Sequence, residues 1–313
     1  MLSVLSVTLP VFALILTGWL VRRAGVLGPH AASELTRFVI YLALPALLFE
    51  VVANAEWQVL WQPGFIGAFG LGVAVVFIGA VVVQLIRRRP LVDSAIDGLN
   101  AAYANTGFLG IPLLLAILGR DSLIPAMIAT VITVCILFAV ALIMLELALQ
   151  RSASSASGPM LGTVGLQLLR NPLLVAPALG LLVLLLGLRL PAPMNDFLQL
   201  LGAAASPCAL VALGLFLAED RPRPQRVAGT VALLVGLKLV LQPLVTWWLA
   251  AQIFGLSAVL VHSAVLLAAL PTGTGPFMAA QLYRRDGAVT SSVILISTVV
   301  SLLTISGLLG LLQ

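Results

Sequence analysis

The stretch "NAAYANTGFLGIP", residues 100–112, interrupts a long apolar segment with two asparagines, a threonine, two glycines and a proline. Proline lacks a backbone N–H, and glycine lets the chain leave the helical conformation, so this composition predicts a broken helix. The residues that break the apolar pattern are Asn105, Thr106, Gly107, Gly110 and Pro112. What the break means depends on whether the segment lies in water or in lipid.

Composition answers that question. The chain has 313 residues, of which 61% are hydrophobic and 9% charged, and its mean hydropathy is +1.18. Soluble domains carry roughly 25% charged residues, so the sequence predicts an integral membrane protein. The net charge of +5 gives no reason to expect nucleic-acid binding, which needs a basic patch on a soluble face.

Apolar runs of about 20 residues are long enough to cross a bilayer as helices. Ten such runs are present, at 3–21, 35–54, 64–86, 95–118, 122–148, 168–187, 196–218, 227–253, 257–282 and 288–311. The predicted fold class is therefore an all-α membrane protein with ten transmembrane helices. The first run has no preceding basic region, and we interpret it as a retained helix.

Basic residues fall on alternate connections. Of the 16 basic residues, only Arg120 and Arg189 lie on the connections expected outside, and Lys238 alone lies deep inside a span. The positive-inside rule then puts the other connections in the cytoplasm and both termini on the outer, periplasmic side of the inner membrane.

The chain repeats itself. At one constant offset, four glycines and prolines of the first half recur in the second: Pro10, Gly18, Gly25 and Pro45 match Pro172, Gly180, Gly187 and Pro207. An odd number of spans per repeat inverts the second copy, as in many secondary transporters. The expected organisation is a five-helix repeat over 1–148, a cytoplasmic linker over 149–167 and a second five-helix repeat over 168–313.

The repeat partner of the opening stretch is "LPTGTGP" in the span 257–282, which holds Pro271, Gly275 and Pro276. Two interrupted spans in corresponding positions are the sequence pointer to a transporter binding site, because freed backbone groups are tolerated only beside protein or a wet cavity. The predicted substrate-binding residues carry amides, hydroxyls, a flexible backbone or a charge: Asn100, Asn105, Thr106, Gly107, Thr272, Gly273, Thr274 and Lys238. The simpler interpretation is that asparagine and threonine only hold helices together and that the prolines only kink them.

Ionisable residues inside spans are candidates for function, because they are costly in lipid. Lys238 could compensate the charge of an anionic substrate or mimic a bound cation, and a buried structural pair or a water cavity is the alternative. We expect Asp97 to begin the span 95–118, where a carboxylate favours the helix N-terminus.

Four segments together resemble the auxin efflux carrier superfamily: "LALPALLFE" (42–50), "NAAYANTGFLGIP" (100–112), "SPCALVALG" (206–214) and "LPTGTGPFMAAQLY" (270–283). The resemblance implies the five-plus-five inverted repeat of the NhaA and bile acid symporter type, in which the fourth and ninth spans cross at their prolines. It also implies a scaffold of spans one, two, six and seven, a mobile elevator unit of the other spans, and a homodimer formed through the scaffold. Pro112 and either Pro271 or Pro276 would lie at the crossing, with Gly110 and Gly275 beside them.

The function expected is alternating-access transport of a small organic anion, such as a carboxylate, across the cytoplasmic membrane, with membrane lipids as surroundings. No hydrolase, prenyltransferase or metal-ligand motif is present in the sequence, so we expect no enzyme activity, cofactor or metal. The alternatives are a sodium-coupled symporter of the bile acid type and a membrane receptor that moves nothing. The direction of transport, its coupling and the substrate's identity stay open at this stage.

Overall fold

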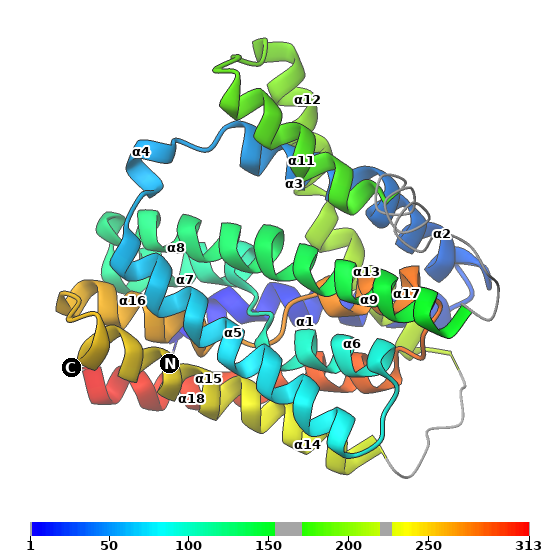
Figure 1. The fold of residues 1–313 in the computed structure, drawn as a ribbon. Helices are drawn as coiled ribbons and strands as arrows, with labels where there is room; N and C mark the ends of the chain where they lie inside the picture. Colours follow the sequence, from blue (N-terminus) through cyan, green and yellow to red (C-terminus); the bar gives the residue numbers. More distant parts are fainter. Residues whose placement is uncertain (1, 154–170, 220–226, 313) are drawn as a thin grey trace.

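The computed structural model describes residues 2–153, 171–219 and 227–312, and within these ranges the regular structure is helical, with no β-strand (Figure 1). The described helices of the first half are α1 (Leu2–Arg23), α2 (Ala31–Phe38), α3 (Leu44–Ala53), α4 (Trp57–Leu60), α5 (Pro63–Ile86), α6 (Leu91–Ala102), α7 (Ile111–Leu118), α8 (Leu123–Thr130) and α9 (Phe138–Ala153). Those of the second half are α11 (Pro172–Leu185), α12 (Ala192–Ala203), α13 (Ala205–Leu217), α14 (Val227–Gly236), α15 (Gln242–Trp248), α16 (Ala258–Ala268), α17 (Gly275–Leu282) and α18 (Ala288–Leu312). Most of the predicted linker lies outside the described residues. The linker was expected to start at residue 149, but α9 continues to Ala153.

Short π-helical turns join several of these helices into longer rods. They are η1 (Val39–Ala43), η2 (Thr106–Gly110), η4 (Val131–Leu137), η5 (Leu237–Leu241) and η6 (Leu249–Ile253), and a 3₁₀ turn, η3, spans Arg120–Ser122. Such π-turns inside α-helices occur frequently at functional sites.

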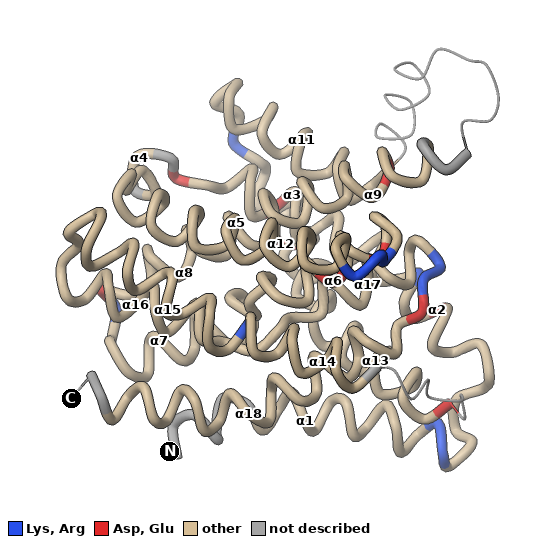
Figure 2. Tube along the Cα trace, turned by 60° about the horizontal axis from the view of Figure 1, so that its bottom comes forward, with Lys and Arg blue, Asp and Glu red and all other residues tan. Residues whose placement is uncertain are grey.

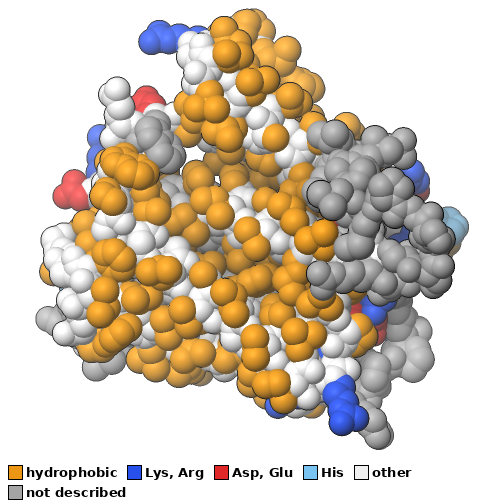
Figure 3. Space-filling view, viewed as in Figure 1, with side chains coloured by type: hydrophobic (Ala, Val, Ile, Leu, Met, Phe, Trp, Pro, Cys, Tyr) orange, Lys and Arg blue, Asp and Glu red, His pale blue; other side chains and the backbone are white. Residues whose placement is uncertain are grey.

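The helices are long and apolar enough for a bilayer. Six described helical stretches meet the length and hydropathy of a membrane span: Ala31–Ala53, Pro63–Ile86, Arg120–Gln150, Ala192–Leu217, Ala228–Ile253 and Ala288–Gly310. Large apolar side chains such as Ile86, Leu185 and Leu200 are at least three-quarters exposed. The broad middle of the face in Figure 3 is hydrophobic, and charged side chains gather toward its two ends. This outward apolar surface suits lipid rather than water.

Two groups of helices pack largely among themselves. The panel consists of α1, α2, α3, α11, α12 and α13, with α3 against α11 and α12 and α1 against α13; α3, α11 and α12 lie at the top of Figure 1. The bundle consists of α5 to α9 and α14 to α18, where α5 packs on α6 and α15, and α14 on α18.

Glycine brings the panel helices close together. A Cβ on Gly214 of α13 would clash with the backbone oxygen of Ile15 in α1, and one on Gly180 of α11 would lie 2.7 Å from the backbone oxygen of Phe49 in α3. Small residues of this kind let membrane helices approach backbone to backbone.

The two termini lie on the same side of the molecule, and most of the described lysine and arginine residues gather at the opposite end (Figure 2). This distribution has the pattern expected of the positive-inside rule.

Candidate functional site: the crossing of two broken helices

Both stretches that the sequence singled out leave the helical conformation. The first helix ends at Ala102 and resumes at Thr106, and the second ends at Ala268 and resumes at Gly275. The gap in the first rod therefore precedes Gly110 and Pro112, which lie in the resumed helix. In the second rod, Pro276 lies in the first turn of α17, where proline is tolerated because its missing N–H would have no partner.

The two gaps pair with each other as a short antiparallel bridge between Ala104 and Thr272. The N–H of Asn105 donates to the carbonyl of Pro271 over 3.0 Å, and the N–H of Gly273 donates to the carbonyl of Tyr103 over 3.0 Å. Backbone groups without partners cost several kcal/mol each in lipid. The hydrogen bonds between the two breaks satisfy some of the backbone groups that each break frees. This explains why two breaks occur together.

Side chains behind the bridge hold it in place. The hydroxyl of Thr272 donates to the carbonyl of Asn100 over 2.8 Å, and its N–H donates to the hydroxyl oxygen of Ser297 over 3.1 Å. The amide of Asn100 donates to the hydroxyl of Thr290 in α18 over 3.0 Å. These four side chains are buried.

The ends of both first half-helices are capped by one neighbouring rod. Lys238 of η5 donates from Nζ to the carbonyl of Ala268 over 2.6 Å, and Gln242 of α15 donates from Nε2 to the carbonyl of Ala102 over 3.0 Å. Neither side chain has measurable exposure. The sequence pointed to Lys238 as an unusual residue, but it gave no sign of Gln242.

A cavity of about 270 Å³ lies between the panel and the crossing. Four of the predicted substrate-binding residues line it: Asn105, Thr106, Gly107 and Thr274. The hydroxyl of Thr106 is buried without a hydrogen-bond partner. Asn100, Thr272, Gly273 and Lys238 do not line this cavity and lie in the network behind it.

Other lining residues escaped the sequence analysis. Tyr103 and Thr130 come from the bundle, and Leu44, Leu47 and Ser206 from the panel. Ser206 and the two leucines lie in segments that carry the family resemblance. That resemblance was the one feature of the sequence that could have pointed to them. Of Asp, Glu, Lys, Arg and His, none is among the described residues that line the cavity.

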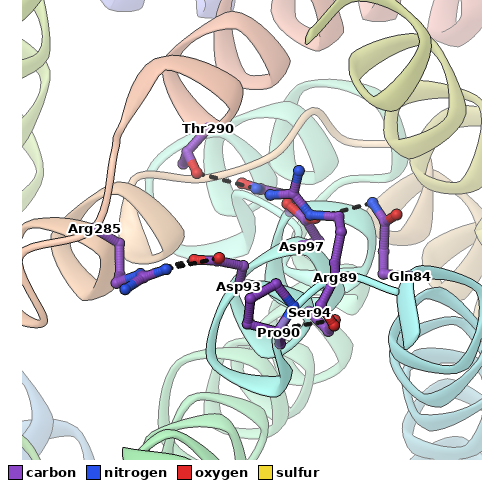
Figure 4. A network of polar contacts seen from close by, with 9 residues as sticks. Gln84, Arg89, Pro90, Asp93, Ser94, Asp97, Arg285 and Thr290 are labelled. Carbon is purple, nitrogen blue, oxygen red and sulfur yellow. Dashed lines mark hydrogen bonds and ion pairs between the residues drawn. The ribbon is translucent and has the colours of Figure 1, made fainter. Parts of the chain in front are cut away.

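A polar cluster lies at the α5–α6 corner (Figure 4). Gln84 donates to Asp97 over 2.9 Å, Arg89 lies 3.0 Å from the same carboxylate oxygen, and Arg285 grips Asp93 with two hydrogen bonds of 2.7 Å. The expectation that Asp97 begins a helix is wrong, because α6 begins at Leu91 and the carboxylate is buried within it. It binds Gln84 of α5 and Arg89 of the connection between α5 and α6, which the local pattern does not reveal.

Comparison with known proteins agrees with the geometry. Residues 3–309 match the model of a family described as "Membrane transport protein". The chain belongs to this membrane transporter family, that of the auxin efflux carriers. The predicted family is thereby confirmed, and the protein is a transporter rather than an enzyme.

Three relatives illustrate the range of the family. A protein of Rhizobium meliloti (strain 1021) named "Putative malonate transporter" is 32% identical over 100% of this chain and 97% of its own length. The "Uncharacterized transporter YfdV" of Escherichia coli (strain K12) is 26% identical over 94% of this chain and 93% of its own length. The "Probable auxin efflux carrier component 5c" of Oryza sativa subsp. japonica is 31% identical over 45% of this chain and 39% of its own length.

Proposed function

We propose that this membrane transporter carries a small organic anion, such as a carboxylate, across the cytoplasmic membrane by elevator-type alternating access. The observation that supports this most is the cavity between the panel and the crossing, which combines amide and hydroxyl side chains, among them the unpaired hydroxyl of Thr106, with a wall of apolar residues. Its volume of about 270 Å³ is just under the roughly 300–1,000 Å³ of pockets for drug-sized ligands, so the solute would be small.

The lining favours an anion. The N–H groups of Gly107 and Phe108 open the resumed helix at the cavity and have no backbone partner among the described residues. A helix N-terminus carries a partial positive charge and offers free donors, so it stabilises a carboxylate. The hydroxyls of Thr106 and Thr274 and the amide of Asn105 add neutral donors. A dicarboxylate such as malonate, named for the Rhizobium relative, is the first substrate to test.

The proposed mechanism takes the panel as a fixed scaffold and the bundle as the moving unit. The cavity is shared between them, because Leu44, Leu47 and Ser206 come from the panel and Asn105 and Thr274 from the bundle. Sliding of the bundle would carry the crossing, with its solute, from one side of the membrane to the other. We further propose ten spans in two inverted five-helix repeats, both termini on the periplasmic side, and a homodimer formed through the panel.

Uptake of radiolabelled malonate into proteoliposomes tests the proposal. Asn105→Ala removes one amide from the cavity lining, and we expect the KM to rise roughly 10-fold, the equivalent of one hydrogen bond to a charged group. The matched control is Asn54→Ala, since the exposed Asn54 lies outside the lining and binds Asn195. The proposal fails if no small carboxylate is transported, or if Asn105→Ala and Asn54→Ala have the same KM.

A further inference from the structure

The two helix ends capped by Lys238 and Gln242 form a site for positive charge. We propose that Lys238, seated with Gln242, takes the position of a coupling cation, so that this carrier works without sodium. The inference rests on the proposed transport function, but its cation-binding part can be tested separately. Lys238 then acts as a positioning residue behind the crossing rather than as a ligand of the solute.

Helix dipoles make this position attractive to cations. Ala102 and Ala268 are the last helical residues of α6 and α16. Their carbonyls have no partner further along their own helices and carry the partial negative charge of a helix C-terminus. In transporters with broken helices, carbonyls and half-helix C-terminal ends of this kind coordinate sodium.

In this protein the carbonyls already have donors. Lys238 and Gln242 stand one helical turn apart, which puts them on the same face of their rod. Each donates to one of the two helix ends, over 2.6 Å to Ala268 and 3.0 Å to Ala102. One rod therefore serves both breaks.

Lys238 has no acidic partner among the described residues. Among the described residues, no carboxylate forms an ion pair with Lys238, whereas Asp97 and Asp93 pair with Arg89 and Arg285. A buried ammonium without a counter-ion is costly, and the backbone carbonyl of Ala268 is its recorded partner. Lys238 therefore donates to the C-terminal end of α16 rather than to an acid.

Gln242 supplies one further oxygen. The carbonyl oxygen Oε1 of Gln242 is buried without a hydrogen-bond partner. Backbone and amide oxygens are suitable ligands for hard cations. Shortening Lys238 would leave the carbonyl of Ala268, this amide and the vacated volume as a place for a small cation and its waters.

Two substitutions separate charge from space. Lys238→Ala removes the ammonium and opens the volume, whereas Lys238→Met removes the ammonium and keeps the volume filled. We measure malonate uptake and, independently of transport, the Tm of the purified protein in NaCl, KCl and choline chloride at equal ionic strength.

For the wild type, flux and Tm are expected to be equal in the three salts. Both variants should lose roughly 10- to 100-fold in flux, the worth of one charged hydrogen bond. Sodium should raise the Tm of Lys238→Ala in a saturable manner and restore part of its flux, and it should do neither for Lys238→Met.

Sodium dependence of the wild type overturns the proposal, and so does an Ala variant that sodium neither stabilises nor reactivates. If Lys238→Ala cannot be purified folded, the three-salt comparison of the wild type still decides. If the wild type moves no carboxylate but sodium selectively stabilises Lys238→Ala, the proposed transport function fails and the cation position stands.

Discussion

Replacement of Gly275 by alanine tests the packing of the crossing. A Cβ at this position would lie 2.6 Å from Cζ, 2.8 Å from Cε2 and 2.9 Å from the hydroxyl oxygen of Tyr103. The tyrosine ring is 6% exposed, packs edge-on against Phe138 with ring centroids 5.8 Å apart, and also lines the cavity. The added methyl group must therefore push the ring toward the cavity or push the two broken helices apart.

The expected magnitude follows from two opposing terms. Overpacking of a filled interior costs about 1–3 kcal/mol, and alanine regains about 0.5–1 kcal/mol of helix preference over glycine. The net destabilisation of Gly275→Ala is then about 0–2.5 kcal/mol, a fall in Tm of up to roughly 10 °C. Transport should fall as well, because Tyr103 lines the cavity.

The control is Gly307→Ala in α18, where a Cβ would meet nothing within 4 Å. That variant should keep only the helix gain of about 0.5–1 kcal/mol. Adding Tyr103→Leu to Gly275→Ala removes the colliding atoms and should recover part of the lost Tm. Thermal unfolding in detergent and malonate uptake measure both effects. If Gly275→Ala is as stable and active as Gly307→Ala, the close approach of the two broken helices is refuted.

Three further substitutions address single groups. Thr106→Val removes a buried hydroxyl that has no hydrogen-bond partner among the described residues; the KM for malonate should rise roughly 10-fold while Tm stays or rises, and an unchanged KM excludes this hydroxyl as a ligand. Arg89→Ala deprives the buried carboxylate of Asp97 of its ion pair and should cost about 1–3 kcal/mol in thermal unfolding, a loss that Asp97→Asn in the same chain should reduce. Tyr283→Phe removes the 2.8 Å hydrogen bond to Glu146 and the 3.2 Å hydrogen bond from Asn171 and should lower stability by about 0.5–1.5 kcal/mol for each bond; a Tm equal to that of the wild type would show that these contacts contribute nothing.

Local pattern was sufficient for the class of protein, for most of its apolar helices and for the two interruptions. The mean hydropathy of about 20 residues indicates whether a segment lies in water or in lipid. Glycine and proline change the conformation of their own backbone. For that reason the segments around Asn105 and Thr274 could be recognised before any contact was known. Two of the four segments that carry the family resemblance are these same segments.

Tertiary structure alone decided which of the recognised residues face the cavity. Asn100 and Asn105 look alike in the sequence, yet Asn105 lines the cavity and Asn100 lies behind the bridge. The partners of Lys238 and Asp97 were likewise hidden, because a side chain's neighbours depend on how helices distant in sequence are rotated against each other. Hydropathy is a property of one segment, whereas the pairing of Ala104 with Thr272 belongs to two segments, and only their packing brings them together.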